Sequence, residues 1–141
     1  MIHESKNDFG GYFENFVIGD IFKHWPGKTI TEMDNHLFSL LTMNHNPLHI
    51  DEHYMTNHQH KKILVVGTLV FSLIVGMSVK DISGKAIANL EYENILHLNP
   101  VFQGDTLYSI STILDVVSSK TKDDRGIVYL ETIGENQMGN K

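Results

Sequence analysis

The most apolar stretch of the chain runs from Leu64 to Val79 and contains no charged residue. Only small residues such as Gly67 and Ser72 interrupt its 16 positions, and a bilayer requires roughly 18 to 20. A helix that is apolar on all sides is buried within a core. The pattern therefore predicts a helix over 64–79 at the centre of a soluble domain.

A second apolar periodicity precedes this stretch. Thr29 and Glu32 have the spacing of a capping box, which marks the start of a helix. Pro47 disfavours helical backbone at the residue before it and cannot donate a hydrogen bond within a helix. We expect an amphipathic helix over about 31–43, because apolar side chains recur at helical spacing, at Met33, Leu37, Leu40 and Leu41.

β-Branched and aromatic residues dominate three later segments, 86–98, 106–117 and 127–133, as is typical of strands. Short turns separate these segments, so we expect three antiparallel strands. Within 106–117, apolar and polar side chains alternate with the period of a strand. An earlier segment, 13–31, predicts a first strand with irregular ends, since a Pro-Gly pair interrupts it.

The predicted order is strand, helix, loop, long apolar helix and strand meander. A helix that is apolar all round must be wrapped, and one antiparallel sheet curling around it is an economical solution for a chain of 141 residues. The sequence thus predicts an α+β hotdog fold in a single domain over 1–141. Because such a sheet has open edges, a homodimer that continues the sheet, or a dimer of dimers, is expected.

The formal net charge is −6 at pH 7, and no basic run is longer than Lys61-Lys62. This composition argues against nucleic acid as a partner, because nucleic acid requires a cationic surface. Cysteine is absent, which excludes thiolate metal sites and a cysteine nucleophile. The N-terminal stretch 1–11 is polar and lacks the apolar region of a signal peptide. The expectation is a cytoplasmic protein with no membrane partner.

Candidate chemistry lies in the polar segment 44–62, between the two predicted helices. Polar loops of this kind often carry functional residues. Pro47 fixes a local backbone angle and puts Asn44 and His49 on either side of a kink, from which both side chains could face one cavity. The spacing alone leaves a catalytic role and a surface or capping role open.

The run from Thr42 to Asp51, Thr-Met-Asn-His-Asn-Pro-Leu-His-Ile-Asp, resembles the hydratase motif of the MaoC-like family of R-specific enoyl-CoA hydratases. The family pattern is Gly-Asp-x-Asn-Pro-x-His, in which Asn46, Pro47 and His49 match and Asn44 stands at the aspartate position. The run looks most like the branch of mesaconyl-CoA hydratases. Further motifs agree in order over about 13–139, namely Thr31–Asn35, Ala88–Leu90, Pro100–Leu107, Ser118–Lys120 and Gly126–Val128.

This resemblance implies a lyase that adds water to, or removes it from, a 2-enoyl thioester of coenzyme A or of an acyl carrier protein. His49 would exchange protons as base or acid, whereas the amide of Asn44 would orient water or substrate. Asn46, Val66 and Gly67 would bind substrate, with a main-chain N–H at the start of the buried helix stabilising an enolate oxygen. Coenzyme A is part of the substrate, so no separate cofactor is expected.

Other charged and polar side chains have weaker claims to the site. Asp34 and Asp51 are candidates to replace the missing carboxylate, although acids at such positions commonly cap helices. Most of the nine histidines, His24 among them, sit in polar surroundings and are expected to be solvated. No metal is expected, because the histidines lack an acid-containing ligand signature. Cations that could bind the phosphates of coenzyme A are Lys61, Lys62, Lys120, Lys122 and Arg125.

Two other functions remain open from the sequence. A hotdog acyl thioesterase needs an acid or a polarised water, but not an acid and a base with opposite tasks. A catalytically silent acyl-binding subunit would keep the fold and lose the aspartate.

The resemblance also bears on the sheet. Family members continue past the Gln-x-Gly turn, here Gln137–Gly139, into one more strand. The expectation is a sheet one strand short, with unpaired amides on 127–133 or its neighbour unless a partner chain covers them.

Overall fold

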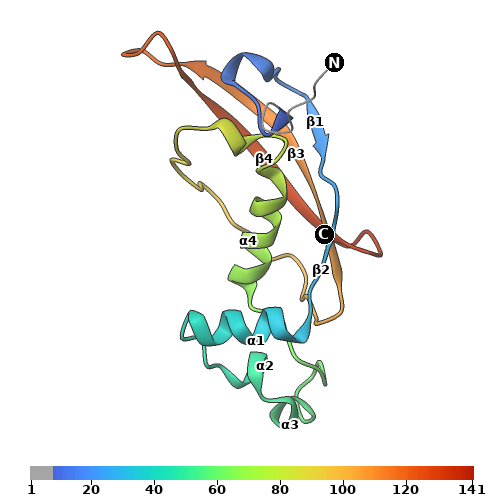
Figure 1. Cartoon of the computed structure of the whole chain (residues 1–141). Helices are drawn as coiled ribbons and strands as arrows, with labels where there is room; N and C mark the ends of the chain where they lie inside the picture. Colours follow the sequence, from blue (N-terminus) through green and yellow to red (C-terminus); the bar gives the residue numbers. More distant parts are fainter. Residues whose placement is uncertain (1–7) are drawn as a thin grey trace.

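The computed structural model describes residues 8–141, so residues 1–7 at the start of the polar N-terminal stretch lie outside the described part. The described elements are, in chain order, 3-10 helix η2 (Phe13–Asn15), strands β1 (Ile21–Lys23) and β2 (Lys28–Thr29), helices α1 (Glu32–Leu41), α2 (Pro47–Ile50), α3 (Glu52–Met55) and α4 (Gly67–Ser78), 3-10 helix η3 (Ser83–Lys85), and strands β3 (Thr106–Ser118) and β4 (Gly126–Asn136). Figure 1 shows the sheet running along α4, with α1, α2 and α3 gathered at one end of that helix.

The sheet is built on β3, because each of the other described strands pairs with it in antiparallel fashion. β4 covers one edge of β3 along nearly its whole length, and β1 and β2 share the other edge. Pro26 and Gly27 lie between β1 and β2, and proline has no N–H to donate to a ladder. The first strand predicted within 13–31 is therefore present as two short pieces.

α4 packs on the inner face of β3 and β4 (Figure 1). Gly134 permits the close approach, since a Cβ at this position would lie 2.5 Å from Cδ1 of Ile74. The predicted helix within 64–79 is confirmed, although it begins at Gly67 and ends at Ser78, and so is the antiparallel sheet packed on it. Among the described residues, no helix has the length and hydropathy that a membrane crossing requires. The main buried apolar cluster consists of Ile30, Val65, Val66, Leu69, Ile74 and Leu107.

The inner face of β3 carries serines. Ser109 and Ser111 are at most 1% exposed, and Leu107 and Ile113, which continue the same alternation, are 2% and 1% exposed. Ser111 Oγ lies 2.8 Å from Nε2 of His24 and 2.8 Å from Oγ1 of Thr132. The small side chains leave room for α4, and the buried hydroxyl of Ser111 obtains hydrogen-bond partners.

His24 is buried, so the expectation that it is solvated is wrong. Its Nδ1 lies 2.7 Å from Oδ2 of Asp81, and its side chain is fully inaccessible. The sequence neighbours of His24 are polar, but its partners come from the turn after α4 and from β3, which no local pattern reveals. The His24–Asp81 pair ties the end of β1 to the end of α4.

The strand predicted over 86–98 is absent from the structure. The segment has no strand pairing, and every residue in it is exposed. Its apolar side chains include Ile87 at 76% exposure and Leu90 at 71%. A strand requires a neighbour for its backbone groups, and this segment has none within residues 8–141. The sequence pattern is that of a strand, but a strand composition alone does not provide the pairing that a strand needs.

α1 is present where predicted, yet its predicted apolar face points outward. Met33 and Leu41 are each 74% exposed, whereas Asn35 and Ser39 are completely buried. The helix buries its polar side chains because Asn35 forms hydrogen bonds with backbone groups of the core. The prediction of its inward face was wrong for that reason.

Candidate active site

Asn35 organises the end of the molecule where α1, α2 and the start of α4 meet. Its Nδ2 donates to the carbonyl oxygens of His49 at 3.3 Å and Leu64 at 3.1 Å. Its Oδ1 accepts the N–H of Val66 at 2.9 Å. These bonds involve three backbone groups that no helix or strand satisfies, so one side chain holds α2 and the chain entering α4 together.

His49 lies in α2, a four-residue helix whose start is fixed by Asn46 and Pro47. The Asn46 side chain caps α2 by accepting the N–H of Leu48 at 3.1 Å. Nδ1 of His49 is 2.9 Å from the carbonyl oxygen of Leu64. A carbonyl only accepts hydrogen bonds, so Nδ1 carries the proton and Nε2 of the neutral ring is the site that accepts one.

The start of α4 offers unpaired N–H groups next to His49. Asn35 already holds the N–H of Val66, so Val66 is not available as a donor to substrate. The N–H groups of Gly67 and Thr68 have no hydrogen-bond partner among residues 8–141. Unpaired amides at a helix start favour negative charge. Gly67, with Thr68, can therefore stabilise a developing oxyanion.

His49 and Gly67 face one cleft, which we call the α4–β4 cleft. It is bounded by α4, by β4 and by the segment 86–101, and its volume is about 1800 Å³. Leu64 and Val65 line it beside His49. His49 and Gly67 thus lie in a cleft whose lining is mainly apolar, as is typical of sites for small molecules with an apolar part.

Asn44, Asn46 and Val66 do not line this cleft. Asn44 is half-buried after α1, and its Oδ1 accepts the N–H of Asn46 at 3.4 Å. The amide of Asn44 thus lies in the loop before His49, and Asn46 is an exposed cap of α2. Of the five residues expected from sequence, the structure brings His49 and Gly67 together in the cleft.

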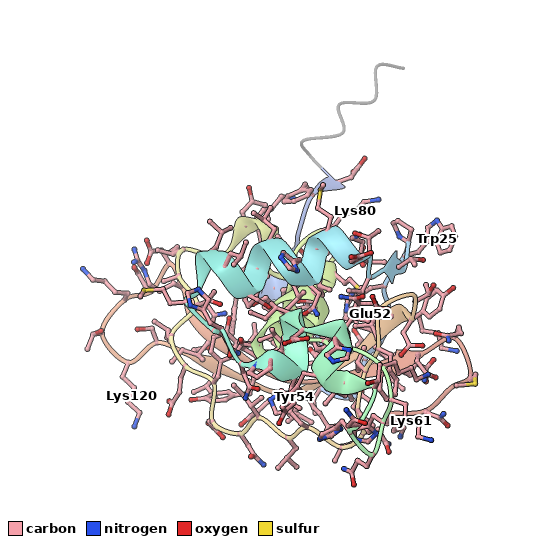
Figure 2. All side chains as sticks on the ribbon, turned by 90° about the horizontal axis from the view of Figure 1, so that it is seen from below. Trp25, Glu52, Tyr54, Lys61, Lys80 and Lys120 are labelled. Carbon is pink, nitrogen blue, oxygen red and sulfur yellow. The ribbon has the colours of Figure 1, made fainter. Side chains whose placement is uncertain are left out.

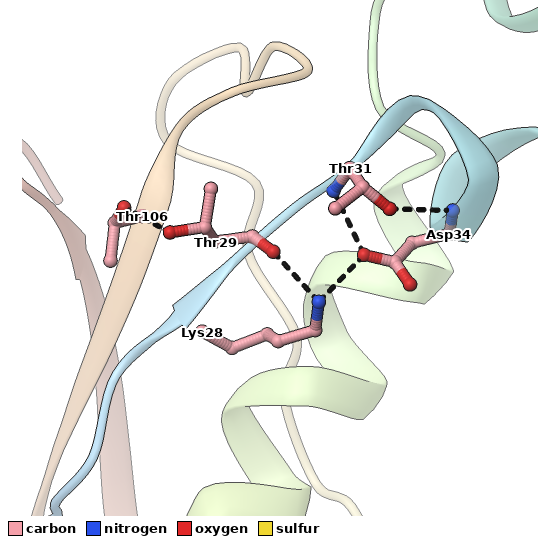
Figure 3. A network of polar contacts seen from close by, with 5 residues as sticks. All are labelled: Lys28, Thr29, Thr31, Asp34 and Thr106. Atoms are coloured by element: carbon pink, nitrogen blue, oxygen red, sulfur yellow. Dashed lines mark hydrogen bonds and ion pairs between the residues drawn. The ribbon is translucent and has the colours of Figure 1, made fainter.

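Asp34 and Asp51 are helix caps and not substitutes for the missing carboxylate. Figure 3 shows Asp34 Oδ2 accepting the N–H of Thr31 at 2.8 Å and a bond from Nζ of Lys28 at 2.7 Å. Lys28, together with the Thr31 N–H, lowers the pKa of Asp34 to about 2. Asp51 caps α3 through the N–H of Tyr54. The cap of α1 is Thr31, two positions after the predicted Thr29.

The candidate cations do not form one patch. Figure 2 shows Lys61 and Lys120 on opposite sides of the molecule. Nζ of Lys62 lies 4.2 Å from the ring centroid of Phe102, and Arg125 forms two hydrogen bonds with Asp124, at 2.7 and 2.9 Å. Lys120 and Arg125, in the loop between β3 and β4, line the α4–β4 cleft, whereas Lys61 and Lys62 do not.

Within residues 8–141, no three histidine or acidic side chains gather in an arrangement that could hold a metal ion. The α2–α3 boundary separates His49 from His53, because Asp51 ends one helix and caps the next.

Sequence reasoning missed Asn35 as a component of the site. It occurs in the quoted run Thr31–Asn35, but a polar residue inside a helical pattern indicates a solvated position. Its partners are 14, 29 and 31 residues away along the chain. Only its match to a family motif could have marked it, since no local spacing predicts those contacts.

Comparisons with known proteins agree on one family. The family model described as MaoC like domain matches residues 14–136. A beta-methylmalyl-CoA dehydratase from Chloroflexus aurantiacus is 32% identical over 134 residues, covering 94% of this chain and 38% of that protein. A mesaconyl-CoA hydratase from Cereibacter sphaeroides is 30% identical over 134 residues, covering 95% and 39%. This chain thus spans about two-fifths of the length of the curated relatives it matches.

A solved structure supports the same fold. A Mycobacterium tuberculosis protein with a double hotdog fold matches with a TM-score of 0.84 at 21% identity. The match covers 93% of this chain and 41% of that one. The hotdog fold predicted from the order of elements is confirmed.

Proposed function

Since the chain belongs to the MaoC-like domain family, as its motifs predict, we propose that it is a hydratase or dehydratase of a short 2-enoyl thioester. The names of two relatives describe addition or removal of water on CoA thioesters, one of them mesaconyl-CoA. The observation that carries the proposal is that His49 and Gly67, whose N–H is unpaired at the start of α4, line one cleft.

The chemistry follows from this arrangement. Nε2 of His49 takes a proton from water, and the water oxygen bonds to the β-carbon of the enoyl group. Electrons of the double bond move to the thioester oxygen, where the N–H groups of Gly67 and Thr68 stabilise the negative charge. The amide of Asn44 cannot exchange protons in this way and does not line the cleft, so in our proposal it supports His49 indirectly, by accepting the N–H of Asn46 in the loop before α2.

We also propose that the working form contains a second copy of the chain. The α4–β4 cleft, at about 1800 Å³, exceeds the roughly 300 to 1,000 Å³ of typical ligand sites. β4 pairs on one edge only within residues 8–141, and the apolar side chains of 86–98 face solvent. A partner that adds to the sheet would cover both the open edge of β4 and the apolar side chains of 86–98, since an exposed strand edge needs a cover. The double hotdog relative carries two such units in one chain.

Hydration of an enoyl-CoA by the purified chain can be measured directly. Purified chain is mixed with mesaconyl-CoA or crotonyl-CoA, and loss of the conjugated thioester absorbance is followed. A thiol-trapping reagent in a parallel sample detects free coenzyme A. Loss of absorbance without thiol release supports the hydratase. Thiol release indicates a thioesterase. If both signals are absent and the thioester still binds tightly, the chain is a catalytically silent acyl-binding subunit, which asparagine at position 44 in place of aspartate also permits.

A further inference from the structure

A second imidazole lies at the start of α4. If a Cβ is built on Gly67, its three nearest atoms all belong to the ring of His97, with Cε1 at 2.8 Å and Nε2 at 3.1 Å. His97 lines the same α4–β4 cleft as His49 and Gly67. The side chain is exposed to the cleft and has no hydrogen-bond partner in the described part of the chain. Glycine at 67 is what leaves room for the ring.

The proposed reaction requires two proton transfers, and His49 provides one of them. Water must lose a proton, and the α-carbon must gain one. Asn44 cannot supply it, and Asp34 and Asp51 are engaged as helix caps. An imidazole exchanges protons readily at neutral pH. We propose that His97 is a catalytic residue of this site, and that its ring donates the proton to the α-carbon of the enoyl thioester.

The proposed step conserves protons and electrons. Nε2 of His49 accepts a proton from water as the water oxygen forms the bond to the β-carbon. The π electrons of the double bond move to the thioester oxygen, held by the N–H groups of Gly67 and Thr68. The protonated ring of His97 then gives its N–H proton to the α-carbon while the carbonyl re-forms. His49 ends protonated and His97 neutral, and exchange of one proton with solvent restores both.

Gly67 has a specific part in this arrangement. Alanine at 67 keeps the main-chain N–H, but its Cβ would displace the His97 ring. The ring is the end of a flexible side chain, so it can move without unfolding α4. Alanine is also a better helix former than glycine, and the stability of the fold should be unchanged or higher. The position of the ring can therefore be altered without removing the oxyanion donor.

This inference rests on the proposed hydratase function, and the experiment separates the two. Hydration of crotonyl-CoA is measured for wild type, His97→Phe, His97→Ala, Gly67→Ala and the double variant Gly67→Ala/His97→Phe. His53→Phe is the matched control, since this histidine is exposed on α3 outside the cleft. Exchange of the α-proton of the 3-hydroxyacyl product with deuterated water is followed in parallel, and free imidazole is added to His97→Ala.

The expected result is a loss of kcat by about 10²-fold in His97→Phe, with little change in KM and in the control. Imidazole should restore part of the activity of His97→Ala, and α-proton exchange should fall with kcat. The double variant should be no slower than His97→Phe, because both changes act on one ring. If wild type hydrates the thioester and His97→Phe matches it, His97 is not catalytic although the proposed function holds. If wild type does not hydrate the thioester, the proposed hydratase function and the catalytic role of His97 are both wrong.

Discussion

At the scale of single residues, the site depends on one buried amide. Asn35 is fully buried and bonds three backbone groups. Asn35→Ala leaves these groups without partners, and each unsatisfied buried group costs roughly 1 to 3 kcal/mol. We expect a loss of about 2 to 4 kcal/mol in the free energy of unfolding, measured with urea at neutral pH. Ser39→Ala, a change of the neighbouring buried residue in α1, is the control. A loss below about 0.5 kcal/mol would show that Asn35 does not hold α2 to α4.

A second prediction for a single residue concerns the substitution of Asn44. Asn44→Asp restores the carboxylate of the family pattern and offers a second group that exchanges protons. Hydration of simple enoyl-CoA substrates, measured as kcat, should therefore rise. Thr42→Val, in the same loop, should leave the rate unchanged. Should Asn44→Asp abolish turnover, the Asn44 amide itself is required in this chain, and the carboxylate mechanism does not apply.

Among the elements, α1 has a pH-dependent cap. Lys28 and the Thr31 N–H stabilise the ionised form of Asp34 and lower its pKa from 3.8 to about 2 (Figure 3). A folded-state pKa below the unfolded one adds stability that is complete above about pH 4 and is lost as pH falls towards 2. Asp34→Asn removes this contribution, so wild type and variant should differ most at pH 7, and the difference should be about halved at pH 3.

The measurement is urea unfolding of both proteins at the two pH values, with Asp51→Asn as the control. Asparagine caps helices about as well as aspartate, so the control should follow wild type. A stability difference between wild type and Asp34→Asn that grows as pH falls would contradict the assignment.

Element by element, the sequence predicts those parts whose burial is decided within the chain. α4, β3 and β4 follow from apolar content and alternation because each packs on the others. Segment 86–98 has the same strand composition, but a strand forms only against a neighbour, and residues 8–141 supply none for it. The inward face of α1 and the burial of His24 depend on contacts far along the sequence. In the site, a local motif predicts His49, whereas Asn35 and His97 depend on such distant contacts.

For the whole molecule, the proposed second copy makes a prediction about assembly. Leu96 is 69% exposed in the segment 86–98, and Leu41 is 74% exposed on α1. Leu96→Glu places a charge in the proposed interface and should shift the molar mass in light scattering from dimer towards monomer. Leu41→Glu introduces the same charge elsewhere and should leave the dimer intact. A wild-type monomer at micromolar concentration would contradict the proposed assembly.

In the proposed mechanism, hydration depends on Nε2 of His49, which lies in α2 and faces the start of α4 across the cleft. The most direct measurement compares kcat for hydration of one short 2-enoyl-CoA by wild type and by His49→Ala, with binding of the thioester measured for both. Deleting a positioned acid or base should lower kcat by about 10²-fold or more, while the binding affinity changes much less. Equal turnover by His49→Ala and wild type would show that His49 is not the base.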